Sequence, residues 1–238
     1  MKRSLKIIKY LLVVVLVVFL YSFTAERNMK RKITNIDVEF IDENRPFIAL
    51  SMVNKLLIQS EDNVTSINKE TLDLKGMENR LLKNPMIRDA QVYLSVNGVL
   101  GAKIEQRTPL ARVAGSPDYY LDTDGMKMPL SEIYTARVPL ISGNSKLNFE
   151  KLTELLLKIN EDPFMKNSVV GLNVLADQKI ILQLRKQDFK VHLGKVEGVE
   201  KKFQNFKAFY QKSKQDNTLV EYKFVNLEFL SQVVATKL

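Results

Sequence analysis

Residues 10–25 read YLLVVVLVVFLYSFTA, and this stretch contains no charged side chain. A helix rises about 1.5 Å per residue, so it would measure about 24 Å here, less than a hydrocarbon core of about 30 Å. The apolar run lengthens to residues 5–24 if Lys9 extends its ammonium group to the lipid headgroups. The sequence therefore predicts a transmembrane helix over residues 10–25, anchored by Leu11, Val14, Val17 and Leu20.

Two other interpretations of this stretch stay open. A cleaved signal peptide also has a basic start and a short apolar run, but small residues should precede its cleavage site, and Phe23 is bulky. A buried helix of a domain core is the second interpretation. Cations flank the stretch on both sides in similar number, and they favour a cytoplasmic N-terminus of residues 1–9 only slightly.

The composition is that of a folded protein, and it limits the kinds of catalytic and metal-binding site that the chain can form. The hydrophobic content is 45%, and the absence of Cys excludes disulfides and thiolate metal sites. The net charge is +9, but eight of the Lys and Arg side chains flank the apolar stretch, and the others are interleaved with Asp and Glu. This pattern argues against nucleic-acid binding. About 210 residues outside the apolar stretch suffice for one large domain or two small ones.

The region after a short charged linker, residues 26–32, has the pattern of a small mixed domain. Apolar residues alternate over 36–40, as in a strand, and recur at helical spacing over 50–57. A polar connection at 60–71 leads to Asp73, which can cap a second helix. Two alternating segments then flank Asn97-Gly98, a strong hairpin signal. We expect a strand–helix–helix–strand–strand domain over residues 33–112.

The remaining residues predict a second domain over 116–238. Asn148 can cap a helix, three short strands follow over 169–174, 179–184 and 189–193, and another helix occupies about 198–211. The segments 222–229 and 232–236 close the chain as a final pair of strands. The short connections between the three central strands favour an antiparallel arrangement. The expected fold class is therefore α+β, with an antiparallel β domain carrying two helices.

No set of residues predicts an enzyme, a cofactor site or a metal site. His192 alternates with apolar neighbours, so we expect it to face solvent or a sheet edge. Residues 122–125 read DTDG and resemble a calcium loop only faintly, because the third acid and the closing Glu are missing. A plain β-turn explains them better. The nine glycines are dispersed and form no phosphate-binding loop.

The final strands are the candidate site for a partner. Nothing follows them in the sequence to cover a sheet edge, and an open edge binds other chains by strand addition. Internal pairing of these strands is the alternative. The candidate residues are Tyr222, Phe224, Val225, Leu227, Glu228, Phe229, Gln232, Val233 and Val234.

Several motifs, in order, resemble those of a known family. The predicted order of the first domain and the run LLKNPMIRDAQV at 81–92 resemble a POTRA domain. IEQRTPLA at 104–111, YYLDTDG at 119–125 and VPLISG at 138–143 are similar to the exit from that domain and the start of the β domain in the bacterial cell-division proteins FtsQ and DivIB. LGK at 193–195 and VNLEF at 225–229 are similar in kind.

This resemblance implies a non-enzymatic scaffold of the divisome. It implies a single-pass inner-membrane protein at the division septum, with a cytoplasmic N-terminus and most of the chain in the periplasm. Its partners would be FtsB- and FtsL-type proteins, docked on residues 222–236 with Lys195 as a further contact, and it would help to regulate septal peptidoglycan synthesis. Glu228 departs from the family, whose better-known members tend to have a basic residue before the last aromatic.

Two other functions compete with this one. A POTRA-type periplasmic chaperone for exported or outer-membrane proteins would explain the first domain, although no transmembrane barrel follows it. A cell-wall hydrolase would require an acid pair or a metal set, which the sequence does not offer.

Overall fold

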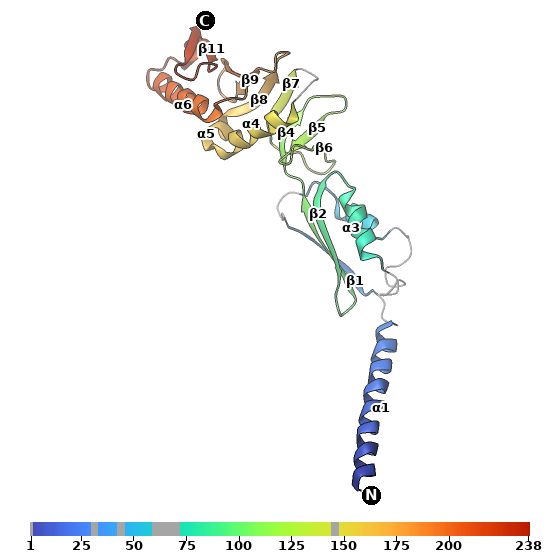
Figure 1. The fold of residues 1–238 in the computed structure, drawn as a ribbon. Coiled ribbons are helices and arrows are strands. Elements are labelled where there is room, and N and C mark those ends of the chain that lie inside the picture. Colours follow the sequence, from blue (N-terminus) through green and yellow to red (C-terminus); the bar gives the residue numbers. More distant parts are fainter. Residues whose placement is uncertain (1, 30–32, 42–45, 59–71, 144–147) are drawn as a thin grey trace. The chain divides into compact units, whose positions relative to one another are not determined.

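The N-terminal element of the computed structural model is helix α1 (Lys2–Met29), which contains the whole apolar stretch (Figure 1). The structure describes residues 2–29, 33–41, 46–58, 72–143 and 148–238. Within these residues, no helix is long and apolar enough to cross a membrane. The predicted transmembrane role of Leu11, Val14, Val17 and Leu20 is therefore not supported.

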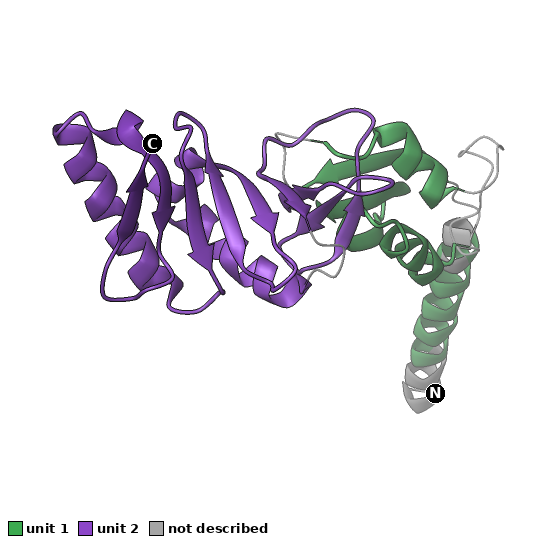
Figure 2. Ribbon diagram, turned by 90° about the horizontal axis from the view of Figure 1, so that it is seen from above, with its two compact units in different colours: residues 1–106 green, residues 107–238 purple. Residues whose placement is uncertain are grey.

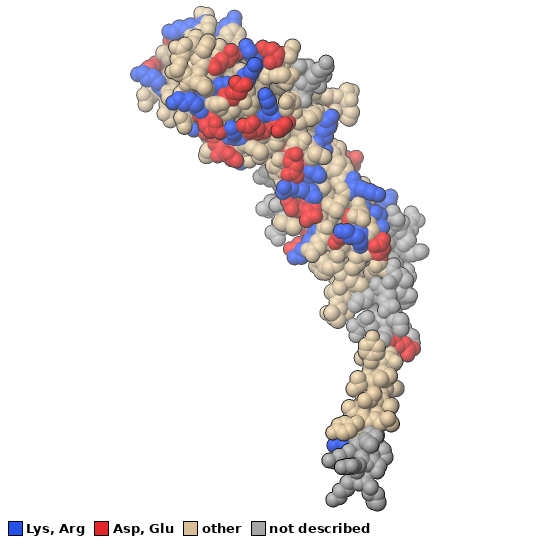
Figure 3. Space-filling view, in the orientation of Figure 1, with Lys and Arg blue, Asp and Glu red and all other residues tan. Residues whose placement is uncertain are grey.

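The chain divides into two units, residues 1–106 and 107–238, coloured separately in Figure 2. Residues 30–32 of the predicted linker and the predicted polar connection at 60–71 lie outside the described residues. In both units, Figure 3 shows basic and acidic side chains intermixed on the visible face, without a large field of one sign.

After α1, the first unit has the predicted order of elements. These are β1 (Asn35–Phe40), α2 (Leu50–Leu57), α3 (Leu74–Leu82), β2 (Ile87–Leu94) and β3 (Val99–Gln106). The sheet order is β1-β3-β2, in which β1 runs parallel to β3 and β2 pairs with β3 as a hairpin. Gly98 has φ 87° in the hairpin turn, a conformation that glycine adopts without a steric cost.

Side chains of both helices and all three strands form one apolar core in this unit. Val53, Leu57 and Leu81 contribute from the helices, and Leu100 and Ile104 from β3, all fully buried. The predicted cap is also present, because the Asp73 carboxylate accepts a hydrogen bond from the N–H of Gly76 at 2.8 Å. Local signals and core burial therefore agree in this part of the chain.

In its described residues, the second unit contains a nine-stranded sheet and three α-helices. The elements are β4 (Pro109–Val113), β5 (Tyr119–Asp122), β6 (Lys127–Pro129), β7 (Leu140–Gly143), α4 (Phe149–Glu161), α5 (Pro163–Ser168), β8 (Val169–Val174), β9 (Ile180–Leu184), β10 (Lys190–Gly194), α6 (Val199–Gln215), the 3-10 turn η3 (Leu219–Glu221), β11 (Tyr222–Asn226) and β12 (Val234–Lys237). The strand order is β12-β11-β10-β9-β8-β7-β4-β5-β6. The helices α4, α5 and α6 lie on one side of this sheet and bury its core (Figure 1).

The α+β class is confirmed, but three details of the expectation are wrong. The sheet is mixed, because β4–β7, β7–β8 and β10–β11 are parallel pairs. Helical crossovers explain two of them: α4 and α5 connect β7 to β8, and α6 connects β10 to β11. A third α-helix, α5, begins at Asp162-Pro163, where the carboxylate accepts the N–H groups of Phe164 and Met165. Strand β4, expected to end the first domain, pairs with β5 and β7 in the second unit.

Candidate partner-binding site

Strand β12 is the terminal strand at one side of the nine-stranded sheet and pairs only with β11 in the described part of the chain. The N–H of Leu238 donates to the Glu221 carbonyl at 2.8 Å, so Leu238 bonds inward, toward β11. Backbone groups of an antiparallel strand alternate in direction, so Thr236 and Val234 also bond inward. The N–H and C=O groups of Ala235 and Lys237 therefore point away from β11, toward the open side.

A second hydrogen bond agrees with this direction of the backbone groups. The N–H of Leu227 donates to the His192 carbonyl at 2.8 Å, so Leu227 bonds toward β10, as does Val225 two residues earlier. Phe224 and Asn226 then bond toward β12, in register with Thr236 and Val234. Ala235 lies within the predicted docking range of 222–236 but was not singled out, and Lys237 lies just outside that range. Strand alternation alone would have identified both once the register was known.

The predicted edge residues lie in β11, in the connection that follows it and at the start of β12. Tyr222, Phe224 and Val225 lie in β11, between β10 and β12, and Val225 and Leu227 are fully buried in the core. These residues are therefore inside the sheet and not at its open edge. The connection from β11 to β12 contains Glu228, Phe229, Gln232 and Val233, and Val234 begins β12.

Three apolar side chains are about half exposed beside the start of β12: Phe229 at 50%, Leu230 at 49% and Val234 at 42%. The Leu230 carbonyl accepts a hydrogen bond from Asn205 in α6 at 2.9 Å, which fixes this part of the connection. A partner strand along β12 would find free backbone groups and, next to them, apolar surface to cover.

Glu228 forms an ion pair within the molecule. Its carboxylate lies 3.3 Å from the ammonium group of Lys179, and its N–H donates to the Asn226 side chain at 2.8 Å. The hydrogen bond that the Lys179 ammonium group donates to the Glu228 carboxylate raises the pKa of Lys179. The acidic residue that departs from the family pattern thus ties the β11–β12 connection to the β8–β9 hairpin.

Lys195 lies elsewhere, in the loop between β10 and α6, and lines a cavity of about 290 Å³. Gly194 and Gly198 flank this loop with φ values of 74° and 58°. The buried side chain of Lys202 in α6 forms hydrogen bonds with the loop backbone. The ammonium group of Lys202 donates to the carbonyls of Leu193 and Lys195 at 2.9 and 2.8 Å. Lys202 was not among the predicted functional residues, although its spacing from Val199 and Phe206 places it on the apolar helix face.

The DTDG segment and His192, the two other candidates from the sequence, make contacts that stabilise the fold. The Asp122 carboxylate, fully buried, accepts from Arg107 at 2.7 Å and from the N–H groups of Asp124 and Met126, so the DTDG segment is a turn closed by an ion pair. The His192 ring packs edge-on against Phe224 at 5.1 Å between ring centroids. It is half-buried on the sheet face rather than at an edge.

A family model described as FtsQ/DivIB, C-terminal related, matches residues 108–236. The chain belongs to the FtsQ/DivIB family. No curated protein matches the chain. The matched residues include β4 to β11 and the first three residues of β12, so they contain Ala235 of the open edge. FtsQ/DivIB proteins form a non-enzymatic scaffold family of cell division, which points to other division proteins as partners and to the septum as the place of action.

Proposed function

We propose that this FtsQ/DivIB protein is a divisome scaffold that binds FtsB- and FtsL-type partners by adding a partner strand to β12. The single observation that supports the proposal is that β12 has one unpaired side in the described residues. An extended partner segment gains affinity from backbone hydrogen bonds and specificity from its alternate side chains. Through such contacts the protein would help to regulate septal peptidoglycan synthesis.

The partner strand would pair with Ala235 and Lys237, whose N–H and C=O groups face outward. Its side chains on the core side would extend the apolar surface beyond Ala235, which packs against the core of the second unit. Those on the opposite side would lie next to Val234 and Thr236. Exposed Phe229 and Leu230 would give the partner further apolar contacts near the start of β12.

A proline at position 235 tests this docking mode. Proline cannot donate to a ladder, and it is tolerated in an edge strand where its N–H would face solvent. We expect Ala235→Pro in the full chain to abolish co-purification of the FtsB- and FtsL-type partners, while its circular dichroism spectrum and melting temperature stay close to those of the unsubstituted chain. Ala235→Ser, which keeps the N–H, is the matched control and should bind normally.

The outcome that contradicts strand addition at β12 is a folded Ala235→Pro variant that still binds its partners. The docking site would then lie elsewhere on the chain. Capture of nascent outer-membrane proteins by crosslinking in cells, in place of small division proteins, would favour a chaperone-type function instead.

We further propose that the parts of both units that follow α1 act outside the cytoplasm, and that the part of the first unit after α1 is a POTRA-type domain that contacts other divisome proteins. Its order of elements and the parallel β1–β3 pair support this assignment. Depletion of the protein should give filamentous cells with unfinished septa. Normal division after complete depletion would contradict the scaffold function.

A further inference from the structure

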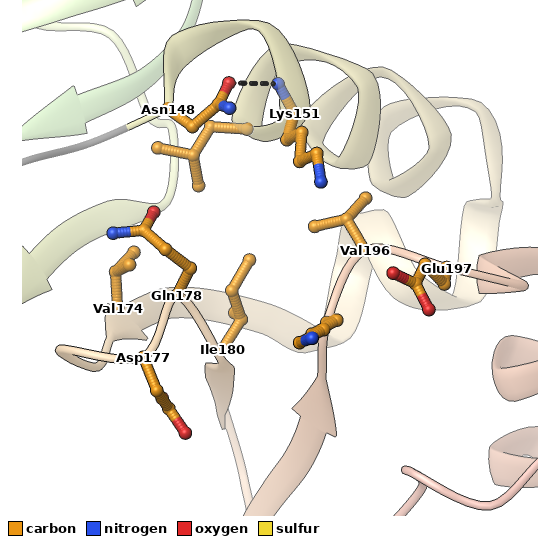
Figure 4. A pocket seen from close by; sticks show the side chains of 10 residues that line it. Asn148, Lys151, Val174, Asp177, Gln178, Ile180, Val196 and Glu197 are labelled. Atoms are coloured by element: carbon orange, nitrogen blue, oxygen red, sulfur yellow. Dashed lines mark hydrogen bonds between the residues drawn. The ribbon is translucent and has the colours of Figure 1, made fainter.

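The cavity beside Lys195 is formed by three segments of the second unit that are far apart in the sequence. The start of α4 contributes Asn148, Lys151 and Leu152, and the loop before α6 contributes Lys195, Val196 and Glu197 (Figure 4). The β8–β9 hairpin contributes Val174, Asp177, Gln178 and Ile180. Its volume of about 290 Å³ is near the lower end for small-molecule sites, which suits a group the size of one amino-acid residue.

The lining combines apolar and basic groups. The apolar side chains are those of Leu152, Val174, Ile180 and Val196. Lys151 and Lys195 are exposed, and neither makes an ion pair with another residue that the structure describes. In Figure 4 the ammonium group of Lys151 points toward the cavity, and the carboxylate of Asp177 points away from it.

The lining also contains two acidic residues, Asp177 and Glu197. Asp177 lies 3.7 Å from the ammonium group of Lys179, which offsets its charge. With Glu197 counted against Lys151 and Lys195, one positive charge is left in excess beside the apolar surface. Such a combination favours a ligand with one anionic end and one aliphatic end.

The walls of the cavity are fixed by hydrogen bonds before any ligand binds. Lys202 holds the loop at the carbonyls of Leu193 and Lys195. Asn148 caps α4 by accepting from the N–H of Lys151 at 3.1 Å, and Asp177 accepts from the N–H of Lys179 at 3.2 Å in the hairpin turn. A fixed cavity loses less conformational entropy on binding, which raises affinity.

We propose that this cavity binds a carboxylate attached to a short aliphatic group, with the carboxylate held by Lys151 and Lys195 and the aliphatic group on Val174, Ile180 and Val196. The inference goes beyond the proposed function, because it does not use β12. The same chemistry occurs in a free short-chain carboxylic acid and in the C-terminal residue of a peptide, and both can be tested.

Titration of the full chain with two probes tests the site. The probes are isovalerate, a free carboxylate, and acetyl-Ala-Leu with a free C-terminus, and acetyl-Ala-Leu amide is the uncharged control. We expect saturable changes in the methyl signals of Val174, Ile180 and Val196 with at least one acid, and none with the amide. A stronger effect of acetyl-Ala-Leu would identify a peptide C-terminus as the ligand, and a stronger effect of isovalerate a free acid.

Variants of the two lysines then test whether each of them contacts the carboxylate of the ligand. Lys151→Gln and Lys195→Gln should each weaken binding about tenfold, the loss typical of one charged hydrogen bond. Lys186→Gln, which removes an exposed lysine outside the cavity lining, should leave binding unchanged. No saturable change with either acid, equal binding of the amide, or equal loss in the Lys186 variant would each overturn the proposal. Because β12 is untouched, these results are independent of partner binding.

Discussion

At the scale of single residues, Lys202 shows how one buried charge can fix the conformation of a loop. Its side chain is only 3% exposed, and its two hydrogen bonds go to carbonyl groups rather than to a carboxylate. Burial lowers the pKa of Lys202, whereas the charges of Glu197 and Glu228 act in the opposite direction. The lysine thus holds the loop that contains Lys195 while its charged form is partly destabilised.

This lowered pKa predicts a specific dependence of stability on pH. Between the lowered pKa in the folded chain and the usual value of 10.5, the unfolded chain binds more protons, so the free energy of unfolding rises with pH. We expect Lys202→Met to remove this rise, which one proton limits to about 1.4 kcal/mol per pH unit. Urea denaturation of both chains from neutral pH to pH about 10 measures the difference.

The neighbouring exposed Lys201 provides the control for Lys202. Lys201→Met should keep the alkaline rise of the unsubstituted chain, because its ammonium group is in water in both states. Parallel curves for the Lys202→Met variant and the unsubstituted chain would show that the buried ammonium group does not titrate as expected.

At the scale of elements, the sheet edges differ in how they are protected. The β2 edge of the first unit is blocked at one point, because the Glu78 carboxylate of α3 accepts the N–H of Val92 at 3.0 Å. Strand β6 at the far side of the large sheet is only three residues long and ends at Pro129. Short strands, proline and charged side chains are common protections of an edge. Strand β12 is also short, at four residues, and contains Lys237, but it has no proline, and in the described residues no side chain bonds to the outward backbone groups of Ala235 as Glu78 does to Val92.

The blocked edge of β2 gives a second prediction. Glu78→Ala removes the acceptor for the Val92 N–H, so we expect its amide hydrogen exchange to accelerate about fivefold, as loss of one hydrogen bond allows. Glu78→Gln keeps a carbonyl oxygen at this position and should retain most of the protection. Unchanged exchange at Val92 in the Ala variant would mean that this hydrogen bond does not protect the edge in solution.

Elements defined by local signals were predictable from the sequence, and those that depend on distant contacts were not. The caps Asp73 and Asn148 and the turn at Asn97-Gly98 act within a few residues, so their patterns sufficed. The parallel pairing of β10 with β11 requires α6 to cross over the sheet, which strand patterns do not reveal. For the same reason the predicted partner residues included buried Val225 and Leu227, and the predicted docking range of 222–236 ended before Lys237.

At the scale of the whole molecule, each of the two units has its own hydrophobic core. The core of the first unit is built from residues 33–104, and that of the second from residues 110–227. The family match, the open edge and the cavity all belong to the second unit. Partner binding at β12 should therefore need only the second unit, as long as the fragment that is produced begins at residue 107, where this unit begins.

That boundary yields the last prediction. A fragment of residues 107–238 keeps Arg107, which pairs with buried Asp122, and β4, which lies between β5 and β7. We expect this fragment to unfold cooperatively in urea and to bind the same partners as the full chain. A fragment of residues 116–238, which begins at the boundary that the sequence suggested, loses both features. Because Asp122 is then buried without its partner, it should be less stable by about 3 kcal/mol or more. Equal unfolding curves for the two fragments would show that neither β4 nor Arg107 is needed for the second unit to fold.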